Sequence, residues 1–222
     1  MERIWLEQYP PGVAADIDLH EFSSLKDILE KSCEKFRTLP AYKNMGVELS
    51  YGQVDELSAR FGAYLQNVAG LEKGDRVAVM MPNLLQYPIA VFGALRAGMV
   101  VVNVNPLYTP RELEHQLKDS GASAIVVLEN FAITLQRVLA NVSVSTVITT
   151  RIGDMFPFPK SLITNLVVKY VKKMVPAWTI TNTVSFNNAL AQGARCSLKE
   201  TPLDHDDVAF LQYTGGTTGV SK

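Results

Sequence analysis

The end of the chain brings together three residue types that suit phosphate binding. Residues 213–222 read Tyr-Thr-Gly-Gly-Thr-Thr-Gly-Val-Ser-Lys. The three glycines let backbone N–H groups converge on an anion, the three threonines add hydroxyl donors, and the lysine adds a mobile positive charge. An ordinary glycine-rich turn needs neither the hydroxyls nor the lysine. The segment is therefore predicted to bind phosphate.

The position of this segment supports the same interpretation. The apolar run 208–211 precedes it and is typical of a buried strand, so the loop opens at a carboxyl strand end, where open parallel sheets bind ligands. It is not a Walker A sequence, because two residues separate Gly219 from Lys222. The predicted phosphate-binding residues are Thr214, Gly215, Gly216, Thr217, Thr218, Gly219 and Lys222.

The residues from 74 to 150 alternate between strand and helix patterns, which predicts right-handed crossovers and a parallel sheet with flanking helices, an α/β fold. Asn83 is expected to cap the first helix, and Thr109 with Glu112 forms a capping box for the second. Gly98 and Gly121 are expected to end them. The expected strands are 76–81, 99–104, 123–128 and 144–149, and the expected helices are 84–97, 110–119 and 131–140.

An N-terminal part precedes these units. Residues 1–22 read as an extended arm, and Ser23-Ser24 is expected to cap a helix over 25–36. Met45-Gly46 is expected to turn a hairpin, and a longer helix follows it. The expected hairpin strands are 41–44 and 47–50, and the expected helix is 51–68. The chain thus divides into 1–72 (arm, helices and hairpin), 73–150 (βα repeats), 151–200 (insertion) and 201–222 (strand and phosphate-binding loop).

Residues 213–222 resemble the phosphate-binding signature of the adenylate-forming (AMP-binding) superfamily of acyl-CoA synthetases, peptide-synthetase adenylation domains and luciferases. That signature reads Tyr/Phe-Thr-Ser-Gly-Ser/Thr-Thr-Gly-x-Pro-Lys, so Gly215 and Ser221 depart from it and inherit no side-chain role. Leu49-Ser50-Tyr51 and the stretch 95–106 resemble its first and second core motifs. The variant is most similar to the bacterial long-chain fatty acid:CoA ligases.

The resemblance implies an activity and its co-substrates. A fatty acid carboxylate attacks the α-phosphate of ATP, giving acyl-adenylate and pyrophosphate, and the CoA thiol then displaces AMP. The loop 214–222 would hold the β- and γ-phosphates with Mg²⁺. The family's catalytic and metal-organising residues lie beyond Lys222, so the chain itself offers none. We expect an N-terminal fragment, from a truncated gene product or a partial sequence, that is inactive alone.

Two alternatives to this activity stay open. One is an adenylate-forming ligase for another carboxylic acid, because the acid-binding pocket of the family also lies beyond Lys222. The other is a non-catalytic module that binds a membrane or a partner subunit. A homodimer is left open.

The stretch 155–199 contains no acidic residue and carries six basic ones. Within 161–174, apolar residues recur at helical spacing with lysines on the other face. Two interpretations compete. The helix lies on an anionic membrane surface, or it is a surface helix packed against the protein. Prolines bound the segment, which reads as an insertion rather than another βα unit. The apolar stripe comprises Ile163, Leu166, Val167, Tyr170, Val171 and Met174.

Composition and charge limit the other functions and kinds of site that the chain could have. The net charge of −1 gives no case for nucleic-acid binding, and the apolar content of 47% permits a sizeable core. Cys33 and Cys196 are expected to be reduced thiols, in keeping with a cytoplasmic location. The uncharged run 77–95 is explained by a strand, a turn and a helix better than by a membrane span. The aspartates between 204 and 207 read as a solvated turn and not as a magnesium site, and the three histidines are isolated.

Overall fold

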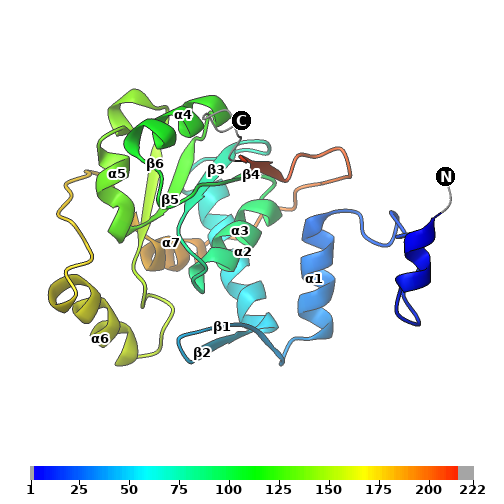
Figure 1. The fold of residues 1–222 in the computed structure, drawn as a ribbon. Coiled ribbons are helices and arrows are strands. Elements are labelled where there is room, and N and C mark those ends of the chain that lie inside the picture. The colour runs from blue at the N-terminus through cyan, green and yellow to red at the C-terminus, as the bar shows by residue number, and fades with distance from the viewer. Residues whose placement is uncertain (1–2, 215–222) are drawn as a thin grey trace.

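The computed structural model describes residues 3–214 and confirms the predicted α/β class. Its centre is a six-stranded sheet in the order β7-β6-β5-β3-β4-β8, and every neighbouring pair is parallel. Helices cover both faces (Figure 1). The strands are β3 (Arg76–Met80), β4 (Val100–Asn103), β5 (Ala124–Leu128), β6 (Thr146–Thr150), β7 (Val184–Ser185) and β8 (Phe210–Gln212).

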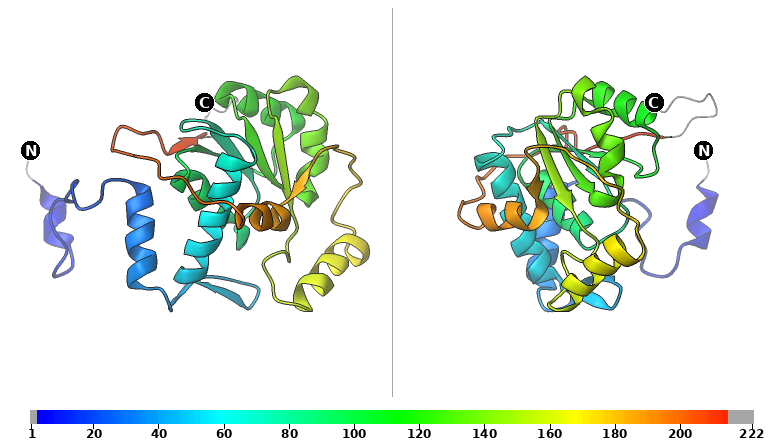
Figure 2. Two further views of the ribbon diagram at one scale, coloured as in Figure 1. Left: turned by 180° about the vertical axis from the view of Figure 1, so that it is seen from behind. Right: turned by 90° about the vertical axis from the view of Figure 1, so that its left-hand side faces the viewer.

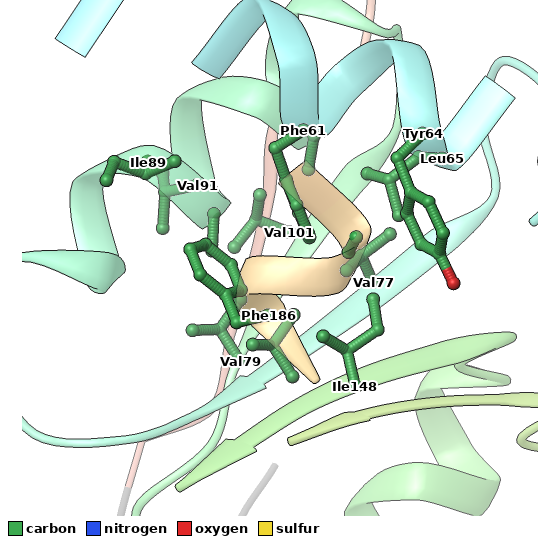
Figure 3. Close-up of a cluster of buried hydrophobic side chains, with 14 of the residues drawn as sticks. Phe61, Tyr64, Leu65, Val77, Val79, Ile89, Val91, Val101, Ile148 and Phe186 are labelled. Atoms are coloured by element: carbon green, nitrogen blue, oxygen red, sulfur yellow. The ribbon is translucent and has the colours of Figure 1, made fainter. Parts of the chain in front are cut away.

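Successive residues of β3 serve two separate cores. Val77 and Val79 point towards α2 (Tyr51–Asn67), α3 (Gln86–Arg96) and α7 (Phe186–Gly193), whereas Ala78 and Met80 point towards α4 (Pro110–Ser120) and α5 (Ala132–Gln136). Side chains alternate between the faces of a strand, so a strand buried on both faces must be apolar throughout. Figure 3 shows the first core, where Phe61 and Phe186 lie with ring centroids 5.0 Å apart.

The N-terminal part follows the prediction closely. Helix α1 (Leu25–Lys35) begins at Ser24, whose hydroxyl accepts a hydrogen bond from the backbone of Asp27 at 3.2 Å. Strands β1 (Pro40–Asn44) and β2 (Val47–Ser50) pair antiparallel as the predicted hairpin.

The predicted ends of α4 are also present. Thr109 and Glu112 form the capping box, and Gly121 ends the helix in the left-handed conformation. These local signals decide the helix ends because they satisfy backbone groups that the helix leaves unpaired.

Four expectations need correction. Asn83 does not cap α3, because a turn at Pro82–Tyr87 delays the helix and places Leu85 at its N-cap. The expected helix 131–140 is instead α5 between two 3-10 turns, η2 (Glu129–Phe131) and η3 (Leu139–Asn141). The arm contains a 3-10 turn, η1 (Ile4–Gln8). Residues 184–193 do form a βα unit, since β7 extends the sheet beside β6 and α7 covers it.

Candidate functional site

Strand β8 brings the predicted phosphate-binding segment to one edge of the sheet. It pairs with β4 alone, and Gln212 stands beside Asn103, the last residue of β4. Thr214, two residues further on, is exposed. The other predicted binding residues, Gly215, Gly216, Thr217, Thr218, Gly219 and Lys222, lie outside the described residues. The structure thus gives the start of the loop the position expected for it, at a carboxyl strand end.

A crevice opens at the same carboxyl end of the sheet, where the helices that follow two neighbouring strands leave over opposite faces. Helix α3 leaves β3 over one face and α4 leaves β4 over the other, so the two connections part between these strands. Such a switch of strand order is where open α/β sheets bind ligands. The crevice has a volume of about 380 Å³. Its polar lining is neutral and comprises Asn83, Tyr87, Asn103, Asn105, Tyr108, Gln212 and Tyr213.

A chain of side-chain hydrogen bonds fixes the end of β8 within this crevice. The Tyr87 hydroxyl donates to Asn103 Oδ1 at 2.9 Å, and Asn103 Nδ2 donates to Gln212 Oε1 at 2.9 Å. Buried Gln116 of α4 donates to the backbone oxygen of Asn103 at 2.8 Å. Helices α3 and α4 therefore hold Asn103, and Asn103 in turn holds Gln212, the last residue of β8, from which the loop departs.

Tyr213 is the first residue after β8, and its side chain is held in place by two contacts. Its ring packs against the α4–α5 core, and its hydroxyl donates to the carboxylate of Asp119. Burial, together with the Asp119 carboxylate, raises the pKa of the Tyr213 phenol to about 12. The phenol is therefore a neutral hydrogen-bond donor throughout the physiological range.

Sequence reasoning missed Tyr87, Asn103 and Gln212, although one signal was available. Asn103 ends an apolar run and Gln212 ends another, and polar residues at the carboxyl ends of two parallel strands meet if the strands are neighbours. The run 208–211 was expected to be a buried strand, but β8 is an edge strand at Phe210–Gln212 and is only partly buried. Pairing of β4 with β8 could not be deduced, because more than a hundred residues separate them.

Other polar groups that the sequence singled out have structural surroundings. The Asp204 N–H donates to the Asp207 carboxylate at 2.9 Å and the Asp207 N–H donates to the Asp204 oxygen at 3.3 Å, which closes the expected turn, and Asp207 pairs with Lys73 at 2.8 Å. Lys73 holds the pKa of the Asp207 carboxyl below its usual range. His205 Nε2 lies 2.8 Å from the Phe22 oxygen. Among residues 3–214, no three His, Cys, Asp or Glu side chains converge as a metal site.

A second candidate surface lies at the other edge of the sheet, on α6 (Lys160–Leu166) and the π-helical turn that continues it, η4 (Val167–Val171) (Figure 2). All six stripe residues named above are exposed, by 37% to 71%. Asn165 is the residue turned inward: its Oδ1 accepts from the Gly153 N–H at 2.8 Å, and its Nδ2 donates to Asp154. The helix is thus attached through a polar side chain, with its apolar stripe facing outward.

A parallel sheet whose edge strand leads into a glycine- and threonine-rich sequence is typical of nucleotide-binding α/β proteins. Comparison with known proteins gives the family. The profile of the AMP-binding enzymes matches residues 29–222, and the chain belongs to that family.

Comparison with individual proteins shows which members of the family this chain is similar to. The chain is 53% identical to the long-chain-fatty-acid–CoA ligase of Escherichia coli O6:H1 and 52% identical to that of Haemophilus influenzae, over all 222 residues in both cases. It spans 40% of the length of the E. coli protein.

Solved structures agree on the fold. The anthranilate CoA ligase AuaEII superposes with a TM-score of 0.73 at 20% identity, covering 92% of this chain and 35% of that protein. A long-chain-fatty-acid-CoA ligase from Archaeoglobus fulgidus superposes with a TM-score of 0.68 at 22% identity, covering 94% and 38%. The six-stranded sheet therefore corresponds to part of these enzymes.

The uncharged run 77–95 is β3, a turn and most of α3, as expected. Among the helices of residues 3–214, none combines the length and the apolar character that crossing a bilayer requires.

Proposed function

We propose that this chain is the nucleotide-binding part of an ATP-dependent long-chain fatty acid:CoA ligase. The observation that carries the proposal is the 53% identity to such a ligase over the whole chain, which includes the phosphate-binding segment after β8. In the proposed reaction a fatty acid carboxylate attacks the α-phosphate of ATP and releases pyrophosphate. The CoA thiol then displaces AMP from the acyl-adenylate.

The loop 214–222 would hold the β- and γ-phosphates. Its backbone donors, threonine hydroxyls and Lys222 would neutralise charge that grows on the leaving pyrophosphate. Asn103 and Gln212 support this by fixing the strand from which the loop departs. Mg²⁺ would arrive bound to ATP.

The test is a ligase assay on the longest reading frame that contains this sequence. With ATP, Mg²⁺, oleate and CoA, the protein should form oleoyl-CoA together with AMP and pyrophosphate. Benzoate in place of oleate separates a fatty acid ligase from a ligase for another acid. Formation of ADP, or no acyl-CoA from any acid, would contradict the proposal.

We also propose that the protein touches the inner face of an anionic membrane through residues 161–174. The supporting observation is the outward apolar stripe, which the described part of the protein leaves uncovered. Lys169, Lys172 and Lys173 lie beside it, and each lysine near an anionic surface contributes about 1 kcal/mol, or about 3 kcal/mol together. Burial of apolar side chains adds to this. The contact would be peripheral and would place the protein where an insoluble fatty acid is delivered.

Vesicle co-sedimentation tests the membrane contact. The protein should bind vesicles containing phosphatidylserine, and binding should weaken as salt rises because the electrostatic part is screened. Changing Lys169, Lys172 and Lys173 together to glutamine should abolish most of the binding. Equal binding by both forms would show that the stripe packs against protein. A homodimer stays a prediction, and the protein's mass in solution would test it.

A further inference from the structure

We propose that the groove beside α6 binds one anionic amphiphile: a carboxylate or phosphate head group carrying a single alkyl chain. The groove has a volume of about 460 Å³ and lies between α6, the loop 151–158 and α7. This groove and the proposed membrane contact share helix α6, and the groove proposal rests on the membrane contact in no other way. The ligand of the groove is a single molecule, whereas the membrane contact needs a surface.

Two rows of side chains along the helix line the groove. Residues spaced by four lie in one row on a helix, so each row runs along the axis for about 12 Å. The inner row is polar and ends in a lysine, and it comprises Ser161, Asn165 and Lys169. The outer row is apolar and comprises Leu162, Leu166 and Tyr170. Such a pair of rows suits a molecule with one charged end and one apolar length.

Apolar side chains extend the outer row beyond the helix. Phe158 lies at its start with 83% of its surface exposed, and Phe156 lines the groove from the body of the protein. Large apolar side chains are costly to leave in water, and burying one is worth on the order of 2 kcal/mol. An alkyl chain laid along this row would remove part of that surface from water. The charged end of the molecule would then lie near Lys169.

The cations at the groove are available to an anion. Arg151 Nε pairs with Asp154 Oδ1 at 3.1 Å, which leaves the two terminal nitrogens of this half-exposed guanidinium outside the ion pair. Asp154 is already satisfied, since it accepts from the Thr150 hydroxyl, the Arg151 backbone and Asn165. Within residues 3–214, Lys169 has no carboxylate within 4.0 Å, although its charge acts on the buried Glu129 from further away, and its amine stands 6.0 Å from the Tyr170 ring centroid. A head group could pair with Lys169 without breaking an existing ion pair.

The turn that carries Lys169 and Tyr170 has the unusual geometry of a π-helix over Val167–Val171. The Lys172 N–H bonds to the Val167 oxygen at 2.8 Å, five residues back. Single π turns are rare and occur frequently at functional sites. Here the wider turn carries both the charged and the aromatic residue at the end of the groove, where the head group of the amphiphile would lie.

Calorimetric titration of the purified protein tests the proposal without any membrane. The probes are decanoate and decyl phosphate below their micelle-forming concentrations, with inorganic phosphate and neutral decyl maltoside as comparisons. One molecule of each anionic amphiphile should bind per chain, and the comparison compounds should bind at least about tenfold more weakly. Lys169→Gln should weaken decanoate binding about fivefold, the loss expected for one lysine at an anionic group.

Lys172→Gln is the matched control, because it removes an equal charge from the same segment outside the groove lining. It should leave decanoate binding unchanged while still weakening vesicle binding. Leu166→Asn should weaken decanoate binding and leave the melting temperature near that of the parent protein, because the side chain is half-exposed. Equal effects of Lys169→Gln and Lys172→Gln on decanoate, or equal affinity for decyl maltoside, would overturn the proposal.

Anionic vesicles then distinguish the source of the head group. If Lys169→Gln weakens vesicle binding more than Lys172→Gln does, the groove takes the head group and one acyl chain of a membrane lipid. If the two variants weaken vesicle binding equally while only Lys169→Gln weakens decanoate binding, the groove takes a free fatty acid. Both results support an amphiphile site. Failure of vesicle binding alone would contradict the membrane contact and leave the amphiphile site standing.

Discussion

Glu129 is a carboxyl group buried where β5 ends, and burial raises the pKa of this carboxyl while the nearby Lys169 and Arg151 oppose the shift. The folded protein therefore holds the proton more tightly than the unfolded chain. It follows that stability falls as the pH rises from the ordinary carboxyl range through the raised pKa. Glu129→Gln removes this dependence. We expect the variant to be more stable than the parent at pH 7 and equally stable near pH 4.

Denaturant unfolding across this pH range measures the effect. Asp16→Asn, which changes an exposed carboxylate of the arm, serves as the control and should follow the parent profile within about 0.5 kcal/mol. Parallel profiles for Glu129→Gln and the parent would show that burial does not control the proton.

Arg96 of α3 is a buried residue, 9% exposed, whose guanidinium contacts Glu30 of α1 and Asp55 and Ser58 of α2. Its Nη1 donates to Asp55 Oδ1 and to the Asp55 backbone, both at 2.8 Å, and to Ser58 at 3.0 Å. Arg96→Met removes these bonds and the ion pair with Glu30, while Arg37 stays 3.7 Å from Asp55 Oδ2. Since Asp55 is partly exposed, we expect a loss of about 2–3 kcal/mol in the free energy of unfolding.

Arg60→Met supplies the comparison for Arg96→Met, since Arg60 pairs with Glu56 on the surface, and it should cost less than about 1 kcal/mol. Equal losses in the two variants would contradict the structural account of Arg96.

At the scale of elements, α7 packs unusually close to α2. A Cβ atom built on Gly193 would lie 1.9 Å from the Arg60 backbone oxygen, and backbone atoms have little freedom to move aside. We expect Gly193→Ala to lower the free energy of unfolding by about 3 kcal/mol, although alanine favours helix more than glycine does.

Asn188→Ala, at an exposed position of the same helix, should change stability by less than about 0.5 kcal/mol. Thermal unfolding of both variants is the measurement. A Gly193→Ala protein as stable as the parent would mean that the two helices are further apart than described.

Elements with local signals were predictable from the sequence, and those fixed by distant partners were not. Ser24, the Thr109 box and Gly121 set helix ends through bonds within a few residues. The pairing of β7 with β6 depends on contacts across more than thirty residues, and two residues of strand carry no pattern of their own. The outward stripe of α6 was also beyond prediction, because helical spacing shows that a face is apolar and not which way it points.

At the scale of the whole molecule, the predicted phosphate-binding residues could be named from the sequence, but the residues that hold the start of their loop could not. The glycines, threonines and lysine of 214–222 predict phosphate binding directly from the sequence. The residues that hold the start of the loop, Asn103 and Gln212, meet only because β8 returns to the sheet beside β4. The strand that leads into the predicted phosphate-binding segment, β8, thus lies at one edge of the sheet, and the outward apolar helix α6 lies towards the other (Figure 1).

The central claim is that the segment after β8 holds the phosphates of ATP. The most direct measurement is kcat/KM for ATP in the ligase reaction of the longest reading frame, comparing the parent with Thr217→Ala and Gly219→Ala. The first removes a hydroxyl donor and the second penalises positive φ, so each should lower kcat/KM by about 10-fold to 100-fold. Thr181→Ala, at an exposed loop position, should match the parent. Unchanged kcat/KM for ATP in both loop variants would contradict the claim.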